Sequence, residues 1–561
     1  MDKITTEGNV AEDPESYGKQ KVTLDTILVN EIGQFGKFQL RAVILAAVIA
    51  IFAAWSASEY VFTTARITTR CVIPECDGPQ PEWSPYWLPN AIPATGSSTF
   101  DNCQRYGNSS ALSRQVESNT CPSSLFDRNY VRPCEDHVYE NTHSVAYDLD
   151  LACDEWRRSL IGTIRTFGTL TALPITGYVS DRWGRRVALT LNAFNTAWMG
   201  VVRFWSNTYI GFMLSEFFEA TFGSGGFSSN YIMLMELMGP KYRVAGGALM
   251  NTCFSVGCVL MGLIAWGVPN WRYLTITLYI PQLLTILYFW LVTESIRWYM
   301  SKGRFDESDA VLRKMAKANG TTVSEKSLQA LRDTALQEAK EKALEEELKG
   351  QEPWLIVQIF QHKPILLRVL VSPVWWVTTT FIYYGLSINA VNMSGNRYLN
   401  YVYVSAVEIP GYWSAVFLLG RIGRKAVLIL GFWICAACQI AYIFMPDNLY
   451  PVSLTVYLIG KFSIAMVMTS IYVYTTELYP TKHRHSLFAY SSMIGRIGSM
   501  VAPLTPAIGA QWFEDLPFVL FASFALLSGG LIFLTPETRD TKLPDTLEEA
   551  SQLGNKNYIK K

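Results

Sequence analysis

Six charged side chains interrupt apolar runs of the sequence, where an ionic group is costly to bury. In membrane-embedded segments such groups usually pair with one another or lie along the path of a charged solute. Two interpretations stay open. In the first, Glu408 is neutralised by Arg496 or Lys461. In the second, these charged groups contact a solute directly. The six residues are Arg165, Glu216, Glu219, Glu408, Lys461 and Arg496.

Aromatic residues gather in one of these runs, between Trp375 and Tyr384. Trp376 and Tyr383 are seven residues apart and therefore share one face of a helix. Aromatic faces attract substituted ammonium groups by roughly 0.5–2 kcal/mol each. Ordinary packing explains most of the 17 tryptophans and 29 tyrosines of the chain.

Motifs for several other kinds of chemistry are missing from the sequence. It has no Gly-x-x-x-x-Gly-Lys-Ser/Thr loop for the phosphates of ATP, and no nucleophile–base pair or cluster of metal ligands in or near the apolar runs. The net charge is zero and the basic residues are scattered. We therefore expect no enzyme, no cofactor, no metal site and no nucleic-acid partner. The five histidines lie outside the apolar runs: His137, His143, His362, His483 and His485.

Three charged segments recur in altered form about 240 residues further along the chain. A repeat of about half the chain indicates duplication of a large unit, as in many secondary transporters. The pairs of segments are 177–186 with 420–425, 236–243 with 477–484, and 294–297 with 536–539.

These charges lie at the ends of apolar runs, where ion pairs can hold two packed halves in one state and release them in another. The alternative is that they are ordinary charges that set the membrane topology. The second copy has Gly420 in place of Asp181, so the second latch is weaker or takes an acid from elsewhere. Arg421 and Arg424 belong to this second copy. The assigned ion pairs are Asp181 with Arg185, Glu236 with Arg243, and Glu477 with Arg484.

Twelve apolar runs approach the roughly 20 residues that a helix needs to cross a bilayer. They predict an all-α membrane protein with two pseudo-symmetric six-helix bundles. The expected spans are 40–62, 158–179, 187–205, 208–235, 244–266, 272–293, 365–389, 399–419, 425–445, 451–475, 486–508 and 517–535. The N-terminal bundle takes span 40–62 and residues 158–293, and the C-terminal bundle takes residues 364–535. The other segments are an N-terminus (1–39), a six-cysteine domain (63–157), an insert (294–363) and a tail (536–561).

Six of the ten cysteines fall in the polar segment between the first two spans. An even number in such a segment predicts three disulfides outside the cell, of open connectivity. Asn108 and Asn392 begin glycosylation motifs on the same side. The other four cysteines are expected to be buried thiols. The six cysteines are Cys71, Cys76, Cys103, Cys121, Cys134 and Cys153.

Basic residues are concentrated in the connections after spans 2, 4, 8 and 10. The opposite short loops offer mainly Arg203, Arg272 and Arg397. The positive-inside rule then places both termini in the cytoplasm of a multi-pass plasma-membrane protein, without a cleavable leader. The insert contains an amphipathic helix that is expected to lie on the bundle or the bilayer surface. Its apolar stripe is Leu328, Leu331, Leu344 and Leu348.

The repeated loops resemble the signature loops of the major facilitator superfamily. The chain is more specifically similar to the organic cation, organic anion and carnitine transporters, solute carrier family 22. The resemblance implies two six-helix halves that rock about a central solute cavity. The segments that carry it are Gly33-Gln-Phe-Gly36, the six-cysteine loop, 236–243, Tyr383-Tyr-Gly-Leu-Ser-Ile-Asn389 and Glu477-Leu-Tyr-Pro-Thr481.

The same resemblance implies which residues line the cavity. Arg496 stands where cation carriers tend to have aspartate and anion or carnitine carriers have arginine. Glu216 stands where relatives commonly have arginine, which weakens a simple anion assignment. The implied substrate-binding residues are Phe227, Asn251, Phe254, Trp376, Tyr383, Glu408, Thr469, Tyr472 and Arg496.

These features favour a secondary active or facilitative transporter of small organic ions that works by alternating access. Buried acids beside one deep arginine suit ammonium-bearing cations or zwitterions, such as carnitine-like, β-alanine-like or biogenic-amine-like solutes. The alternatives are an organic anion exchanger and a non-transporting membrane receptor. The expected partners are the solute and the lipid bilayer, with a monomer as the transport unit. Self-association through the extracellular domain stays open.

Overall fold

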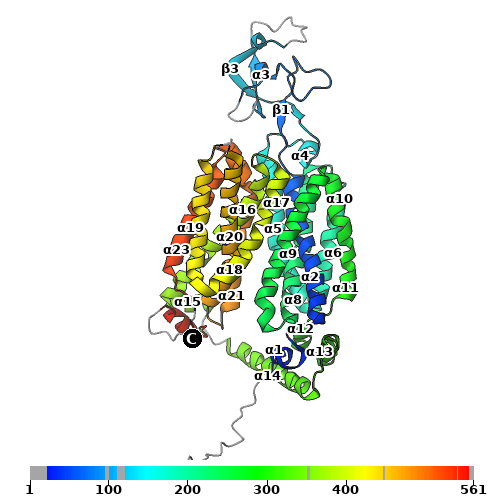
Figure 1. The fold of residues 1–561 in the computed structure, drawn as a ribbon, viewed down its shortest axis with the longest axis vertical. Coiled ribbons are helices and arrows are strands. Elements are labelled where there is room, and N and C mark those ends of the chain that lie inside the picture. Colours follow the sequence, from blue (N-terminus) through cyan, green and yellow to red (C-terminus); the bar gives the residue numbers. More distant parts are fainter. Residues whose placement is uncertain are drawn as a thin grey trace, which may run out of the picture.

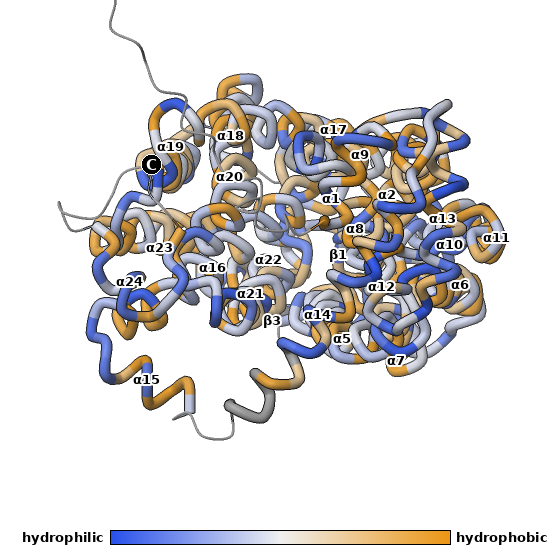
Figure 2. The backbone as a smooth tube through the Cα atoms, turned by 90° about the horizontal axis from the view of Figure 1, so that it is seen from below, coloured by the Kyte–Doolittle hydropathy of each residue, from blue (hydrophilic) through white to orange (hydrophobic). Residues whose placement is uncertain are grey.

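The computed structural model describes residues 22–94, 100–109, 121–349, 354–446, 449–539, 541 and 543–554. Two groups of long helices stand side by side beneath a small domain of strands and loops (Figure 1). From below, α18, α19, α20 and α23 lie on one side, and α2, α6, α7 and α10 on the other (Figure 2). The outer parts of the predicted termini, 1–39 and 536–561, fall outside the described residues.

The N-terminal half consists of long helices joined by short connections. Two of its predicted spans are each made of more than one helical segment: α7 ends at Gly223 before α8, and α10 continues through a short 3-10 helix into α11. The helices are α2 (Lys37–Thr63), α5 (Glu155–Trp183), α6 (Arg185–Arg203), α7 (Tyr209–Gly223), α8 (Gly225–Leu237), α9 (Pro240–Gly267), α10 (Trp271–Gln282), η3 (Leu283–Leu287) and α11 (Tyr288–Leu291).

The C-terminal half repeats this pattern. Its predicted second span is interrupted at Val407, much as the N-terminal half is interrupted at Ser224 between α7 and α8. The helices are α16 (Lys363–Asn389), η4 (Ala390–Asn392), α17 (Arg397–Ala406), α18 (Glu408–Ile422), α19 (Arg424–Ile443), α20 (Tyr450–Leu478), α21 (Arg484–Val501), η6 (Ala502–Leu504), α22 (Thr505–Gln511), α23 (Leu516–Leu531) and η7 (Ile532–Leu534).

Within the described residues, eight helical segments are long and apolar enough to cross a membrane. The predicted spans that do not reach this measure fall on α5, α6, α7 with α8, and α21 with α22. Arg165, Arg203 and Glu219 lie in three of them, which lowers their hydropathy. The count of twelve spans therefore stays a prediction.

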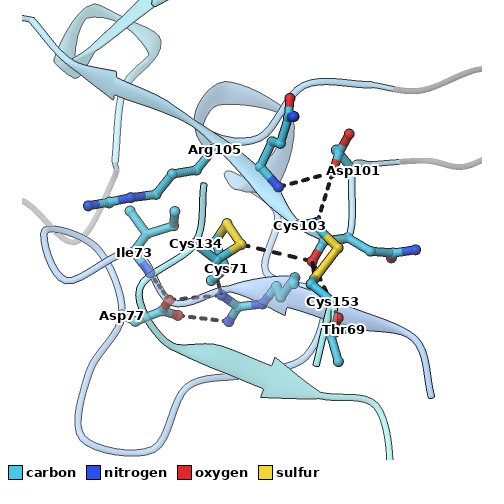
Figure 3. Close-up of a disulfide and its surroundings, with 12 residues drawn as sticks. Thr69, Cys71, Ile73, Asp77, Asp101, Cys103, Arg105, Cys134 and Cys153 are labelled. Carbon is cyan, nitrogen blue, oxygen red and sulfur yellow. Dashed lines mark hydrogen bonds and ion pairs between the residues drawn. A yellow bond between two sulfur atoms is a disulfide. The ribbon is translucent and has the colours of Figure 1, made fainter. Parts of the chain in front are cut away.

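The domain between α2 and α5 is held by three disulfides and two small antiparallel sheets. The disulfides join Cys71 to Cys134, Cys76 to Cys121, and Cys103 to Cys153, which confirms that all six cysteines pair. Figure 3 shows the first and the third of these bonds. Strand β1 (Thr69–Cys71) pairs with β4 (His137–Tyr139), and β2 (Gln104–Asn108) pairs with β3 (Phe126–Pro133). The short helices of this region are α3 (Leu88–Ala91), η2 (Ser123–Leu125) and α4 (Val145–Asp148).

A buried ion pair adds to this small core. The Arg70 guanidinium donates to both carboxylate oxygens of Asp77 at 2.8 Å, and the backbone N–H of Ile73 donates to the same carboxylate at 2.7 Å (Figure 3). Few apolar side chains are available in so short a segment, so cross-links and buried polar contacts carry much of its stability. Asn108 lies in β2 and Asn392 at the end of η4, and both side chains are exposed.

The opposite end of the molecule carries the insert and the terminal helices (Figure 1). Leu328 and Leu331 of the predicted stripe are buried in this layer, whereas Leu344 is exposed and the side chain of Leu348 falls outside the described residues. Asn319 accepts from the Phe38 N–H at 3.0 Å and so fixes α13 to the start of α2. These helices are α1 (Leu24–Ile27), η1 (Leu28–Ile32), α12 (Ile296–Ser301), α13 (Phe305–Asn319), α14 (Glu325–Lys349), α15 (Leu355–Gln361) and α24 (Leu547–Gln552).

The two halves pack together toward the disulfide-linked domain. Helix α9 contacts α17 and α18, while α5 contacts η6 and α22. The Phe62 ring stacks on Tyr398 with centroids 5.6 Å apart and meets the Tyr401 ring edge-on at 4.9 Å. The helices approach closely here, because a Cβ added to Gly262 would lie 2.8 Å from the side chain of Val402.

The disulfide pattern gives a direct prediction. Replacing Cys103 and Cys153 with serine opens a loop of 50 residues, which is expected to cost the domain about 3–4 kcal/mol. Protease digestion of the double variant should cut the domain faster than in the unaltered protein. Peptide mapping of the unaltered protein without reductant should recover the three cross-links, and any other pairing would contradict the fold.

Candidate functional site

A cavity of about 210 Å³ lies between the two halves, largely within the N-terminal one. Helices α2, α5, α6, α7, α8 and α9 supply most of its wall, with η3 and the end of α10, and α16 and α21 close the opposite side. Charged groups from both halves border it, together with five aromatic rings. Those residues are Arg165, Glu219, Arg496, Phe52, Tyr60, Phe227, Phe254 and Tyr384.

Three of the nine predicted substrate-binding residues line this cavity. Phe227 and Phe254 meet edge-on with ring centroids 5.5 Å apart, and Arg496 faces them from α21. Tyr384 lines the cavity. The adjacent Tyr383, which was predicted to line it, points instead to Glu408 on the other face of α16. The six that do not line it are Asn251, Trp376, Tyr383, Glu408, Thr469 and Tyr472.

Trp376 is part of an aromatic cluster inside the C-terminal half. Its indole N–H donates to the Thr475 hydroxyl at 3.0 Å, and its ring packs edge-on against Tyr472 and Phe488 at 4.8 and 5.5 Å. The Thr469 hydroxyl is buried without a hydrogen-bond partner among the described residues. In this conformation the predicted ammonium site at Trp376 is filled by protein.

Glu408 is neutralised within the C-terminal half. Its carboxylate lies 2.8 Å from the Lys461 ammonium and accepts from the Tyr383 hydroxyl at 2.7 Å. Lys461 is fully buried and also donates to the Ser387 hydroxyl at 2.7 Å. Of the two interpretations, this geometry matches neutralisation of Glu408, with Lys461 rather than Arg496 as the partner.

The same carboxylate links the two halves of the molecule. The Ser255 hydroxyl of α9 donates to Glu408 of α18 at 2.8 Å. Nearby, the Trp413 indole N–H donates to the Thr252 hydroxyl at 3.1 Å, again from α18 to α9. A change in the relative position of the halves must break or exchange these bonds.

A larger network of buried charges lies in the N-terminal half. Arg165 contacts Glu216 and lies 2.6 Å from Glu219. Arg203 lies 2.6 Å from Glu59 and 3.1 Å from Glu216, and also contacts Glu219. All five side chains are buried, so each charge depends on its neighbours for stabilisation.

Neutral groups complete this network. The Thr275 hydroxyl donates to Glu59 at 2.8 Å, and the Tyr279 hydroxyl donates to Glu219 at 3.1 Å. Both donors come from α10, so five helices, α2, α5, α6, α7 and α10, meet at this point. Only Arg165 and Glu219 also border the cavity, which connects the network to the central site.

At the helix ends opposite the disulfide-linked domain, several charged residues pair differently from the prediction. Asp181 and Arg185 pair as expected, at 2.8 Å, but Arg185 rather than Arg243 faces Glu236, at 3.8 Å. Arg243 instead contacts Asp25 of α1. The prediction was wrong because the segment before span 1 forms α1, whose Asp25 brings a carboxylate to this arginine.

In the second copy too, the acid pairs with a different arginine from the one predicted. Glu477 accepts from two nitrogens of Arg424 at 2.9 Å each, not from Arg484. Arg484 donates to the Tyr479 carbonyl at 3.3 Å, and the Arg421 guanidinium lies over the Phe417 ring at 3.7 Å. Each acid thus pairs with the arginine that begins the third long helix of its half.

A second pair of glutamates caps these same helix starts. Glu294 accepts from the Arg185 N–H at 2.8 Å, and Glu537 accepts from the Arg424 N–H at 2.9 Å. Each carboxylate lies at the positive end of a helix dipole. Burial raises the pKa of Glu294, and hydrogen bonds from backbone N–H groups oppose this shift. These glutamates come from the third repeated segment, so the duplication preserves a capped helix start in both halves.

The glycines before these helices are required by the caps. Gly184 and Gly423 have φ values of +102° and +100°, in a region that other residues rarely adopt. An added Cβ would lie 2.2 Å from the Glu294 carboxylate and 2.7 Å from that of Glu537. The repeated glycine therefore permits both the turn and the close approach of the acid.

Comparison with known proteins identifies the family. A profile described as "Sugar (and other) transporter" matches residues 95–550. The chain belongs to this transporter family. The organic cation transporter protein of Drosophila melanogaster is 29% identical over 537 residues, covering 94% of this chain and 95% of that protein. Solute carrier family 22 member 2 of Rattus norvegicus is 28% identical over 549 residues, covering 95% of this chain and 96% of that protein.

A solved structure supports the fold of this transporter. The inward-open conformation of the xylose transporter XylE from E. coli matches with a TM-score of 0.59 at 15% identity, covering 90% of this chain and 98% of that one. The predicted resemblance to the major facilitator superfamily and solute carrier family 22 is thus confirmed. Family and fold are those of transporters rather than enzymes.

Two central charges of the transporter were missed or misplaced by sequence reasoning. Arg203 was taken as a loop charge, yet its side chain is 0% exposed. Glu59 was overlooked, although an acid inside the apolar run 40–62 is itself a signal of a functional or paired group. Glu59 also explains how Arg203 is accommodated in the apolar interior.

The buried network of the transporter predicts unequal effects of two arginine substitutions. Arg203→Ala leaves three carboxylates facing only Arg165, and removing one partner from a buried ion pair costs about 3–5 kcal/mol. Arg397→Ala removes a hydrogen bond to the Arg66 carbonyl, 3.1 Å long, and should have little effect. The thermal stability of each purified variant is measured by size-exclusion chromatography after heating, as the temperature at which the monodisperse peak is lost. Equal effects of the two variants would contradict the network.

The helix caps give a second matched comparison. Gly423→Ala forces an alanine into a left-handed conformation, which costs about 1–2 kcal/mol, and drives its Cβ into Glu537. Gly420→Ala lies three residues earlier, where an added Cβ meets nothing within 4 Å. We expect the first to lower the thermal stability and the second to leave it unchanged. A Gly420→Ala variant as unstable as Gly423→Ala would refute this role of the cap.

Proposed function

We propose that this transporter carries small organic ions that bear an ammonium group, and zwitterions above all, by alternating access. The observation that carries the proposal is the opposite formal charge on the two sides of the central cavity. The buried network that reaches the cavity from the N-terminal half holds one more carboxylate than guanidinium, and the wall from the C-terminal half presents a guanidinium.

The N-terminal wall supplies the site for the ammonium group. Its network holds three carboxylates, Glu59, Glu216 and Glu219, against two guanidiniums, Arg165 and Arg203. With all five ionised, one negative charge is in excess. An uncompensated buried charge is costly, so a cationic group that enters beside Glu219 is favoured.

The C-terminal wall supplies the site for a carboxylate. Glu408 and Lys461 cancel each other, so Arg496 provides the net charge on this side. Arg496 lines the cavity and has no ion-pair partner among the residues that the structure describes. A guanidinium can bind a carboxylate through two parallel hydrogen bonds.

Five aromatic rings complete the site. They are Phe52, Tyr60, Phe227, Phe254 and Tyr384, which all line the cavity. Rings of this kind attract a substituted ammonium group by roughly 0.5–2 kcal/mol each. Carnitine-like, β-alanine-like and biogenic-amine-like solutes fit this chemistry. The similar Drosophila protein is named an organic cation transporter, which supports the same class of solute.

Alternating access requires that the packed ends of the halves separate. The halves meet toward the disulfide-linked domain through α9 with α17 and α18. In the predicted plasma-membrane topology, with both termini in the cytoplasm, this arrangement is the inward-facing state. We assign the pairs of Arg185 and Arg424 to the latch that rearranges in the opposite state. Trp376, Tyr383, Thr469 and Tyr472, with Asn251, would join the solute path in that state.

Uptake measurements test the proposal with two solutes that differ in one group. Carnitine has a quaternary ammonium and a carboxylate, and choline has the ammonium alone. Arg496→Ala should lower carnitine uptake about tenfold or more, because a hydrogen bond to a charged group contributes roughly 1.5–3 kcal/mol. Choline uptake should change far less, and Arg496→Lys should retain part of the carnitine uptake.

The same experiment separates the alternatives. Preferred uptake of a carboxylate without an ammonium group would identify an organic anion exchanger instead. An equal loss of both solutes in Arg496→Ala, with normal protein at the cell surface, would contradict the assigned role of Arg496. Absence of any saturable uptake in the unaltered protein would favour a non-transporting receptor.

A further inference from the structure

A second cavity of about 280 Å³ lies at the end of the N-terminal half that points away from the disulfide-linked domain. It is enclosed by α2, α6, α8 and α11, and by α13 of the insert. Its volume is close to the lower limit of the roughly 300–1,000 Å³ typical of small-molecule pockets. It shares no lining residue with the central cavity, so the transport proposal does not use it.

The inner wall of this cavity is formed mainly by apolar side chains. Leucine and methionine side chains from α6 and α8 form much of it, including Leu189, Met233 and Leu234. Its two main polar groups are already engaged within the protein. The Asn230 amide donates to the Ala46 carbonyl at 2.8 Å, and the Tyr288 hydroxyl donates to the Leu45 carbonyl at 3.0 Å.

The mouth of the cavity is cationic. Lys37 and Arg41 of α2 and Lys314 of α13 border it, all three are exposed, and no acidic residue is among its lining. In the described part of the chain, none of the three has an ion-pair partner. On α13 and α14, Asp309 is paired with Arg332, and Glu325 with Arg313.

The helices beside the mouth carry apolar side chains on the outside of the bundle. Ile44 of α2 is 57% exposed and Trp290 of α11 is 70% exposed, as expected of surfaces that face acyl chains. Leu291 is exposed and also lines the cavity, so the apolar interior continues toward this outer surface. The site therefore combines an apolar interior with three cations that have no acidic partner among the described residues. One of them, Arg41, also donates to the Leu291 carbonyl at 3.4 Å.

We infer that this cavity binds an anionic phospholipid of the adjacent leaflet, which is the inner leaflet in the predicted topology. The lipid phosphate lies among Lys37, Arg41 and Lys314, and part of one acyl chain enters the apolar interior. Basic pockets between membrane helices on the cytoplasmic side suit such headgroups. A soluble phosphate would leave the apolar interior unused, and a zwitterionic lipid would bring no net negative charge to the three cations.

Ligand-induced thermal stabilisation of the purified full-length protein tests this inference. The probe is short-chain phosphatidylinositol 4-phosphate, compared with phosphatidylcholine of the same chain length and with the soluble inositol phosphate headgroup. We expect the anionic lipid to raise the unfolding temperature most. The double variant Arg41→Ala with Lys314→Ala should need at least about tenfold more lipid for the same shift, since it loses two charged contacts of roughly 1 kcal/mol or more each.

Lys317→Ala is the matched control, because Lys317 is an exposed lysine on the same helix that does not line the cavity. It should respond to the lipid like the unaltered protein. Equal stabilisation by the soluble headgroup would show a phosphate site rather than a lipid site. Equal stabilisation by phosphatidylcholine, or an unchanged response of the double variant, would also overturn the inference. None of these readouts depends on transport activity.

Discussion

The structure depends on one electrostatic constraint, which is that charges inside an apolar helical bundle must be neutralised where they lie. The C-terminal half meets it with a single pair, Glu408 and Lys461, supported by the Tyr383 hydroxyl. The N-terminal half meets it with a five-membered network that joins five helices. This network joins the helices of the N-terminal half and reaches the central cavity through Arg165 and Glu219. Under the proposed function, stability and solute selection therefore share the same residues.

A second constraint acts at the ends of the helices, and there the two halves still show their common origin. In each half a glycine with positive φ lets a glutamate reach the start of the third long helix, and an arginine in the first turn pairs with a second acid. The copies differ in their outer partners. Asp181 supports Arg185 in the first, whereas Arg424 makes two short bonds to Glu477 without such an acid. The two copies of this charged helix start therefore differ in their ion-pair partners.

The sequence was sufficient for the family, the two-half organisation and the pairing of the six cysteines, because hydropathy, repetition and cysteine count are local signals. It was insufficient for contacts between distant segments. Arg243 and Glu236 are close in the chain, yet Arg243 pairs with Asp25, which precedes the first span. Tyr383 and Tyr384 are adjacent, but only the structure shows that Tyr384 faces the cavity. The burial of Arg203 and its contact with Glu59 likewise depend on how helices pack, and disulfide connectivity depends on the fold of the domain between α2 and α5.

The central claim is that the cavity orients a zwitterion between an acidic wall and Arg496. A structure of the transporter with bound carnitine tests this most directly. The account predicts the ammonium among Tyr60, Phe254 and Tyr384 on the side of Glu219, and the carboxylate within about 3 Å of the Arg496 guanidinium. A solute bound in the reverse orientation, or one held at Glu408 with its Lys461 pair broken, would contradict it.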